Sequence, residues 1–316
     1  MTKMMKVVQI HQYGNPEVLK LEELPRPEPA PGELLVRVQA AGVNPVDLKT
    51  RAGSGVAGRL GDDPFPLILG WDISGIVEEI GAGVTRFKKG DAVYGMPRFP
   101  QIAAAYAEYV SIPDVEVAHK PQSIDHIHAA ALPLVSLTAW QALFEAIDLK
   151  DGQNILIHAA AGGVGHIAVQ LAKWKNAFVI GTASAHNADY LAEIGVDQFV
   201  DYRAYRFEDV VSDVDVVLDA MSGNVRQRSW SVLKPGGIIV SILGPPSAET
   251  AAQYGVRATN VLVHPDGRQL AEIAALADSG ILKPNVEAVY PLAEAAQAHA
   301  HVQKGHTRGK IVLRTD

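Results

Sequence analysis

The chain of 316 residues contains no cysteine. This absence excludes disulfide bonds, thiolate ligands for a metal and a cysteine nucleophile. It also fits a reducing cytosol, where disulfides are rare. No run of about 18 uncharged apolar residues occurs, and the opening residues MTKMMKVVQI hold too short an apolar stretch for a signal peptide. We therefore expect a cytoplasmic protein that is not inserted in a membrane.

Blocks of basic residues are missing as well. The formal net charge is −7 and the lysines and arginines are scattered along the chain, so the electrostatic pattern of a nucleic-acid-binding protein is absent. Hydrophobic residues make up 48% of the chain and charged residues 20%, which is typical of a soluble globular protein. The length suffices for two domains of ordinary size.

The chain is organised around one stretch, NILIHAAAGGVGHIAVQLAKWK at positions 154–175. It opens with the apolar run 155–157, which is typical of a strand buried on both faces of a parallel sheet. A glycine-rich turn follows, and apolar residues then recur at helical spacing from 167 to 172. The stretch predicts a strand, a tight turn and a helix.

A turn of this shape suits the pyrophosphate of a dinucleotide, because the N–H groups and the dipole of a helix N-terminus favour negative charge. The three glycine slots of the fingerprint G-x-G-x-x-G hold Ala160, Gly162 and Gly165. Since the first slot lacks glycine, the motif alone fits either a cofactor site or an ordinary glycine-rich turn. On the cofactor interpretation, the backbone contacts come from Ala161, Gly162, Gly163, Val164 and Gly165.

The rest of the chain divides into two kinds of pattern. Short strand-like runs separated by turns fill the first hundred residues and predict a β-rich domain. From position 178, strands alternate with helices expected near 188–194 and 226–233, which predicts an open parallel sheet covered by helices on both faces. A further amphipathic helix is expected at 269–279, and the final strand GKIVL could return to the first domain.

Several long motifs occur in the order of one known family. They include YGNPEVLKLEELPRPEPAPGELLVRVQAAGVNPVDLK, GWDISGIVEEIGAGVTRFKKGDAVYG, AALPLVSLTAWQAL, HAAAGGVGHIAVQLAK, LKPGGIIV and RGKIVL. In series they resemble the zinc-free branch of the medium-chain dehydrogenase/reductase family, the quinone oxidoreductase and enone reductase group. The resemblance implies an α/β protein with a GroES-like catalytic domain at 1–125 together with 277–316. A Rossmann domain with a doubly wound parallel sheet would occupy 126–276.

The resemblance also implies that no zinc is bound. The positions that match the zinc ligands of alcohol dehydrogenases in the wider family hold Asn44, Trp71 and Leu134, and none of these is a competent replacement for thiolate or imidazole. Without a Lewis acid to polarise an alcohol oxygen, alcohol oxidation is the wrong chemistry. We expect reduction of an acceptor that is already electrophilic, a quinone or an α,β-unsaturated carbonyl.

The family further implies a nicotinamide cofactor, and the residues after the second strand of the dinucleotide domain favour NADPH. NAD enzymes carry an acid there that binds the ribose 2′-hydroxyl, whereas here the first acid is Asp189. Hydrogen bonds to a 2′-phosphate would come from a polar set, with helix capping the alternative role for the first three members. This set is Ser184, His186, Asn187 and Tyr202, with charge added by Arg203 or Arg308.

Catalytic roles are assigned by the same resemblance. Asn44 matches the asparagine beside the nicotinamide ribose and the substrate carbonyl, a role compatible with capping the helix that begins at Pro45. Lys49 would hold a ketone oxygen through its ammonium group or would be a solvated surface lysine. Trp71 would line the substrate pocket or pack in the core. Thr138, Leu243 and Gly244 match positions that meet the nicotinamide.

Together these features predict an NADPH-dependent oxidoreductase that transfers hydride to a quinone or an enone, with Lys49 favouring the enone. The alternative from another class is a non-catalytic NADPH-binding protein used for sensing or storage. We expect a small electrophilic substrate, no nucleic acid and no membrane as partners. A homodimer is expected, and an apolar strand at 260–263 (NVLV) is the candidate pairing edge.

Overall fold

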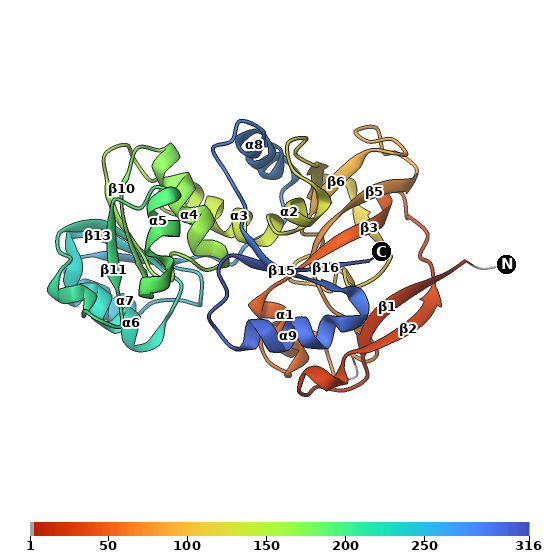
Figure 1. Cartoon of the computed structure of the whole chain (residues 1–316), viewed down its shortest axis with the longest axis horizontal. Helices are drawn as coiled ribbons and strands as arrows, with labels where there is room; N and C mark the ends of the chain where they lie inside the picture. Colours follow the sequence, from red (N-terminus) through yellow and green to blue (C-terminus); the bar gives the residue numbers. More distant parts are fainter. Residues whose placement is uncertain (1–2, 63, 316) are drawn as a thin grey trace. The chain divides into compact units, whose positions relative to one another are not determined.

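The computed structural model describes residues 3–62 and 64–315, and contacts divide the described chain into two compact units (Figure 1). The first unit runs as far as Leu134 and includes His264–Gly280 and the chain from Pro284 onward. The second comprises Val135–Val263 together with Ile281–Lys283. Residues 1, 2 and 316, which end the predicted first domain, lie outside the described residues, as does residue 63.

The first unit holds two sheets among its described residues. A three-stranded antiparallel sheet has the order β2-β1-β4, and a seven-stranded sheet has the order β15-β16-β3-β5-β6-β8 with β7 also paired to β3. The strands are β1 (Met4–Ile10), β2 (Lys20–Pro25), β3 (Glu33–Val43), β4 (Leu67–Ile68), β5 (Asp72–Ile80), β6 (Ala92–Gly95), β7 (Tyr109–Pro113), β8 (Val117–His119), β15 (Val286–Pro291) and β16 (Lys310–Arg314).

The predicted C-terminal strand is confirmed, because β16 pairs antiparallel with β3 and places Ile311 opposite Val43. Alternating apolar residues of β3 and its neighbours point into one core, where Leu34, Val36 and Ile73 are fully buried. This unit therefore has the β-rich character that the short strand patterns predicted.

Four α-helices of the described chain belong to the first unit: α1 (Pro45–Arg51), α2 (His126–Ala130), α8 (Gly267–Asp278) and α9 (Ala295–Gln303). The helix expected at 269–279 is thus confirmed as α8, but it lies in the first unit rather than in the predicted 126–276 domain. Its attachment explains why, since the Tyr94 hydroxyl donates to the Leu270 carbonyl at 2.5 Å. The α2 helix is likewise held to β5 by the contact of Ser74 Oγ with His126 Nδ1 at 2.8 Å.

The second unit contains the predicted open sheet. Its six described strands are all parallel to their neighbours, in the order β11-β10-β9-β12-β13-β14. Their bounds are β9 (Asn154–Ile157), β10 (Phe178–Ala183), β11 (Gln198–Asp201), β12 (Val214–Asp219), β13 (Leu233–Ser241) and β14 (Arg257–Asn260). The apolar runs predicted these strands because a parallel sheet is buried on both faces.

The helices of the second unit alternate with these strands. They are α3 (Pro133–Trp140, whose first two residues belong to the first unit), the π-helix η4 (Gln141–Ala146), α4 (Gly163–Trp174), α5 (Ala188–Glu193), α6 (Gly223–Ser229) and α7 (Ala248–Gln253). The helix expected at 226–233 begins three residues earlier and ends sooner, because a 3-10 turn at Trp230–Val232 leads directly into β13.

The segment 260–263, predicted as a strand, is mostly not one. The edge strand β14 ends at Asn260; the Val261 N–H still donates to the Ser241 carbonyl at 2.9 Å, but residues 261–263 belong to no described strand. The apolar character that suggested a strand belongs partly to exposed surface, since Leu262 is 53% exposed. The edge of the sheet is therefore formed by 257–260.

Candidate functional site

The carboxyl ends of the parallel strands gather most of the predicted cofactor residues on one edge of the second unit. From β9, the strands β10 and β11 are added on one side and the strands β12 to β14 on the other, so the strand order reverses beside β9. In open α/β sheets, ligands bind outside the carboxyl ends of the strands at such a point. The predicted residues at this edge are 161–165 after β9, Ser184, His186 and Asn187 after β10, Tyr202 after β11, and Leu243 and Gly244 after β13.

The glycine-rich turn joins β9 to α4, which begins at Gly163 after the N-cap Gly162. A Cβ added at Gly165 would lie 2.8 Å from Ala160 Cα and closer still to the Ala159 carbonyl oxygen, so only glycine fits there. The N–H groups of the first helical turn have no acceptor within a helix. This arrangement of a tight turn and a helix N-terminus is suited to the pyrophosphate of a dinucleotide.

Ala160, in the slot that lacks glycine, has a structural explanation. Its N–H donates to the Thr182 carbonyl at 3.0 Å, which ties the turn to the neighbouring strand β10. The Ala160 Cβ also packs beside Gly181, where an added Cβ would lie 3.0 Å from it. Alanine is therefore accommodated at position 160 because the facing residue on β10, Gly181, has no side chain.

Polar side chains cluster after β10, where no carboxylate ends the strand. Ser184 and Asn187 are buried and His186 is exposed. The Asn187 amide donates to Ser184 Oγ at 3.4 Å and contacts His186 Nε2 at 3.2 Å, while Ser184 Oγ lies 3.1 Å from His186 Nδ1. Neither Ser184 nor Asn187 makes a side-chain capping bond to the helix that follows it. The three side chains thus form one polar group.

Tyr202 follows β11 beside this group. Its N–H donates to the Ala183 carbonyl at 3.2 Å, and its ring is 50% exposed with the Arg203 guanidinium 5.8 Å from the ring centroid. Thr138 lies in α3 of the same unit and is buried. These positions leave Tyr202 accessible for a ligand at the carboxyl edge.

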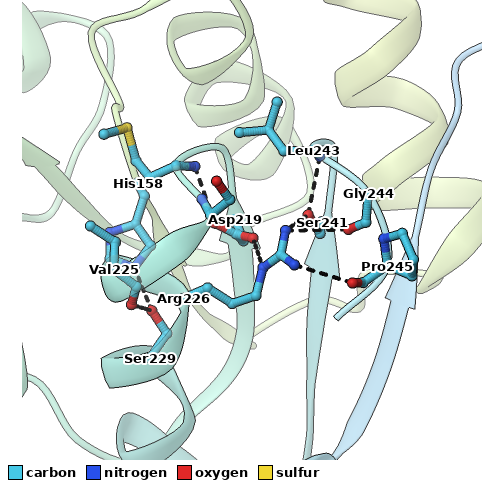
Figure 2. Close-up of polar contacts among 11 residues, drawn as sticks. His158, Asp219, Val225, Arg226, Ser229, Ser241, Leu243, Gly244 and Pro245 are labelled. Carbon is cyan, nitrogen blue, oxygen red and sulfur yellow. Dashed lines mark hydrogen bonds and ion pairs between the residues drawn. The ribbon is translucent and has the colours of Figure 1, made fainter. Parts of the chain in front are cut away.

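An ion pair that the sequence patterns did not single out lies at the ends of β12 and β13 (Figure 2). Asp219, the last residue of β12, accepts from Arg226 Nε of α6 at 2.5 Å. The same guanidinium bonds to Ser241 at the end of β13 and to the carbonyl of Gly244. An acid at the end of a buried strand, in VDVVLDAM, was the signal that could have found it.

Asn44 lies in the first unit, fully buried at the N-cap of α1. Its Oδ1 accepts from Lys310 Nζ, and its Nδ2 donates to Asp72 Oδ2 at 2.8 Å. Its backbone N–H donates to Asp47 Oδ2 at 2.7 Å. Both ends of the Asn44 amide are therefore fixed by charged partners, and Lys310 was not identified from the sequence.

Burial is the largest influence on the pKa values of the charged side chains around Asn44. Burial raises the pKa of Asp72 and lowers the pKa of Lys310, although the two side chains lie 3.5 Å apart and each favours the charged form of the other. Burial also raises the pKa of Asp47 to about 7, despite hydrogen bonds from the Asn44 N–H and the Tyr106 hydroxyl. The surroundings of Asn44 thus contain a carboxyl that titrates near neutral pH.

From Asp47, a series of hydrogen bonds leads away from Asn44 to Arg51. Arg51 Nη1 can only donate, so His299 Nδ1, at 3.2 Å, is its acceptor. His299 Nε2 lies 3.1 Å from the Tyr106 hydroxyl, which donates to Asp47 Oδ2 at 2.9 Å. Burial lowers the pKa of His299 to about 3, so the imidazole is neutral at neutral pH.

The other predicted residues of the first unit lie in different surroundings. Lys49, in the last turn of α1, is exposed. Trp71 is fully buried, donates to the Gln101 carbonyl at 2.7 Å and packs edge-on against Phe99, so it holds the loop 97–102. Arg308 donates its N–H to Glu287. Trp71 is not joined to Asn44 by any bond found in the described residues.

Two of the three positions that match zinc ligands, Asn44 and Leu134, donate to one carboxylate, that of Asp72. Asn44 Nδ2 donates to Asp72 Oδ2, and the Leu134 N–H donates to Asp72 Oδ1 at 2.7 Å. Residues 3–62 and 64–315 contain no group of three or more His, Cys, Asp or Glu arranged to hold a metal ion. Within the same residues, no helix has the length and apolar character needed to cross a bilayer.

Two known protein families match parts of the chain. Residues 30–122 match the family described as alcohol dehydrogenase GroES-like domain, and residues 194–313 match the family described as zinc-binding dehydrogenase. The chain is 33% identical to NADPH-dependent alkenal/one oxidoreductase, chloroplastic, of Arabidopsis thaliana, over 98% of this chain and 80% of that protein.

Solved structures are similar over nearly the whole chain. The quinone oxidoreductase from Coxiella burnetii is 39% identical, with a TM-score of 0.93 and coverage of 99% of this chain and 100% of that one. Escherichia coli quinone oxidoreductase complexed with NADPH is 29% identical, with a TM-score of 0.87 and coverage of 98% and 100%. The two units and their sheets thus have counterparts in these proteins, and the chain is an oxidoreductase of the medium-chain dehydrogenase/reductase family.

Proposed function

We propose that this oxidoreductase uses NADPH to reduce a quinone or an α,β-unsaturated carbonyl without a bound zinc ion. The single observation that carries the proposal is the carboxyl edge of the second unit, where the glycine turn and the polar group after β10 lie on neighbouring strands. A dinucleotide spans such an edge with its pyrophosphate at the turn. The relatives named for NADPH and for alkenal, enone or quinone substrates support the same assignment.

The preference for NADPH rests on the end of β10. A carboxylate at this place would bind a ribose 2′-hydroxyl and repel a 2′-phosphate. Ser184, His186 and Asn187 offer hydroxyl, imidazole and amide groups instead, and exposed Tyr202 follows on the next strand. Arg203, whose guanidinium lies 5.8 Å from the centroid of the Tyr202 ring, is a candidate in the second unit to add positive charge.

When bound, the reduced nicotinamide supplies a hydride from its C4 atom to an electrophilic carbon or quinone. The protein residues then position the acceptor and stabilise the negative charge that develops on its oxygen. We assign the first role to Asn44, because its amide is held in one orientation by Lys310 and Asp72. A fixed amide costs no reorganisation when it donates to a ribose or substrate oxygen.

Lys49 is assigned to the second role. Its ammonium group has three donors, and among the described residues it has no acceptor, so it is available for a carbonyl oxygen. An exposed lysine without a ligand-binding role remains the alternative. The variant Lys49→Ala separates them, because loss of an oxyanion donor lowers kcat by roughly 100-fold or more, whereas loss of a surface lysine leaves kcat within about twofold.

Zinc independence follows in this proposal from the side chains at the matching positions. Asn44 is occupied by Lys310 and Asp72, Trp71 donates to a carbonyl, and Leu134 has no ligand atom in its side chain. The match to the family described as zinc-binding dehydrogenase covers residues 194–313, which contain none of these three positions. Metal analysis of the purified protein, together with activity after dialysis against a chelator, tests this directly; activity restored by added zinc would refute it.

The primary test is steady-state oxidation of NADPH and of NADH with a naphthoquinone, a 2-alkenal and a 2-enone. We expect NADPH to be preferred and the alkenal or enone to be reduced faster than the quinone. A dominant quinone rate would leave the cofactor assignment intact but contradict the role of Lys49. Equal use of NADH would contradict the phosphate role of the group after β10.

Two further expectations belong to this proposal. A non-catalytic NADPH-binding protein would bind NADPH tightly yet turn over every acceptor slowly, so the same assay distinguishes it. We also propose a homodimer and a cytoplasmic location, although the Arabidopsis relative is named chloroplastic. Sedimentation of the purified protein measures the first, and localisation of the tagged chain measures the second.

A further inference from the structure

The ion pair at the ends of β12 and β13 is more extensive than a single contact (Figure 2). Asp219 is fully buried, and its Oδ2 accepts from Arg226 Nε at 2.5 Å. Its Oδ1 accepts from the N–H groups of Met221 at 3.1 Å and Ser222 at 2.8 Å. One carboxylate therefore holds both the turn that leaves β12 and the helix α6 that follows it.

The turn held by Asp219 has an unusual backbone. Ser222 has a φ of 56°, a value that a residue with a side chain rarely adopts. Burial would raise the pKa of Asp219, but hydrogen bonds from the Ser222 N–H and from Arg226 outweigh it and hold the pKa below its ordinary value. The carboxylate is thus ionised at neutral pH and keeps the turn in this conformation.

The remaining donors of Arg226 reach the segment 242–245, which follows β13. Nη2 donates to Ser241 Oγ at 2.7 Å and to the Gly244 carbonyl at 3.2 Å, and Nη1 donates to the Pro245 carbonyl at 3.2 Å. Ser241 Oγ in turn accepts from the Leu243 N–H at 3.1 Å. The planar guanidinium therefore bonds to two carbonyls of the segment 242–245 and to Ser241 at the end of β13, which a point charge such as an ammonium group does not do.

A second anchor prevents α6 from moving with Arg226. The Ser229 hydroxyl donates its one hydrogen to the Val225 carbonyl at 2.8 Å, so it accepts from His158 Nε2 at 2.9 Å. His158 Nδ1 then accepts from the Thr182 hydroxyl at 3.1 Å on β10. Because α6 is tied to the sheet here as well, the position of the Arg226 guanidinium is set by the sheet.

The segment 242–245 follows β13, which lies on the opposite side of β9 from β10 and its polar group. In a doubly wound sheet the 2′ position of the adenosine ribose is read at the end of the second strand, here β10, and the pyrophosphate lies at the turn after β9. The other half of the dinucleotide then lies over β12 and β13, on the opposite side of β9. The exposed Leu243, at 41%, belongs to that side.

Resting on the proposed function, we propose that Arg226, held by Asp219, is a positioning residue that fixes segment 242–245 against the nicotinamide half of bound NADPH. Arg226 does not touch the reacting atoms. It holds the backbone of Leu243 and Gly244 in the conformation that contacts the nicotinamide. The segment is therefore ordered before the cofactor binds, and binding loses less conformational entropy.

The test compares ligands that report on different halves of the site. NADPH and adenosine 2′,5′-bisphosphate are titrated calorimetrically into wild type, Arg226→Met, Arg226→Lys and the control Arg228→Met. Arg228 lies two residues further in α6 and pairs with Glu208 at 2.7 Å, with a side chain 29% exposed against 15% for Arg226. The control therefore removes a comparable ion pair from the same helix.

We expect Arg226→Met to weaken NADPH binding by about tenfold or more while adenosine 2′,5′-bisphosphate binding stays within about twofold. Arg226→Lys keeps the positive charge beside Asp219 but loses the planar set of guanidinium donors, so it should weaken NADPH binding by about threefold. This variant remains informative if the Met variant does not fold. Arg228→Met should leave both affinities within about twofold.

Two results would overturn the inference. In one, both ligands lose affinity together in the Arg226 variants, which indicates a general loss of structure. In the other, Arg226→Lys and Arg226→Met bind NADPH as the Arg228 control does. If wild type binds neither ligand, the proposed function itself fails, so the two failures are distinguishable.

Discussion

Replacing Lys310 by methionine tests whether the buried charges around Asn44 act as one unit. Met has nearly the length of Lys but removes the cation that lies 3.5 Å from Asp72, where both side chains are at most 3% exposed. Breaking a buried ion pair by removing one partner typically costs about 3–5 kcal/mol, because the other charge is left uncompensated. Asp72 keeps the Asn44 amide and the Leu134 N–H as donors, so we expect a loss of about 3 kcal/mol.

The measurement is the free energy of unfolding of the first unit in urea at pH 7. Trp71 is the one tryptophan of that unit, so its ¹⁹F resonance in 5-fluorotryptophan-labelled protein reports on it separately. Adding Asp72→Asn to Lys310→Met should restore roughly 1 kcal/mol or more, because the uncompensated charge is removed. The control Lys89→Met breaks the pair with Glu78 in the same unit, in which Lys89 is 68% exposed, and should cost less than about 1 kcal/mol.

The reasoning would be refuted by a Lys310→Met variant within about 1 kcal/mol of wild type, since a buried unpaired carboxylate cannot be that inexpensive. It would also be refuted if the double variant were less stable than the single one by the full cost of Asp72→Asn alone. That result would mean that the two side chains contribute independently and that Lys310 supports Asn44 only.

Three further predictions follow from burial and from steric fit. His158 has a pKa of about 4 in the folded chain, so it binds fewer protons than in the unfolded chain; its stability contribution is complete above pH 6.5 and is lost as the pH falls towards 4. The urea stability of wild type relative to His158→Gln should therefore fall by about 2 kcal/mol between pH 7.5 and pH 5, and a constant difference would contradict this. Asp47 has a raised pKa of about 7, so its contribution has the opposite sign and is lost as the pH rises to 7. Wild type relative to Asp47→Asn should lose about 1.4 kcal/mol between pH 6 and pH 8, and a gain over this range would refute the buried, protonated carboxyl. Gly165→Ala should cost about 1–3 kcal/mol and weaken NADPH binding, whereas Gly58→Ala, whose added Cβ meets nothing within 4 Å, should be neutral in both measurements.

The sequence predicted those features that depend on neighbouring residues. The strand, turn and helix at 154–175 follow from apolar spacing and from glycine, and the structure places β9 and α4 there. The alternation after 178 predicted a parallel sheet, and the pattern of GKIVL predicted the returning strand. In each case, local propensity and burial favour the same structure.

The sequence did not predict which polar residues pair across the fold. Lys310 meets Asn44 and Asp72 across more than 230 positions, and Arg226 reaches Asp219 and Ser241 from separate elements. Such partners depend on the register of strands and on the helix that covers them, which periodicity does not specify. The sequence did not place α8 in the first unit for the same reason, since the bond between Tyr94 and Leu270 is long-range.

The pairing of β16 with β3 has a consequence for how the chain acquires its structure during synthesis. The register that joins Ile311 to Val43 cannot form until residues 310–314 have left the ribosome, whereas the strands β9 to β14 are complete some fifty residues earlier. The nascent β3 must therefore wait with one edge unpaired, and closing so long a loop is slow unless the intervening sheet has already folded and shortened it. Synthesis thus favours a fixed order, in which the sheet β9–β14 forms before β16 pairs with β3 and completes the sheet of the first unit.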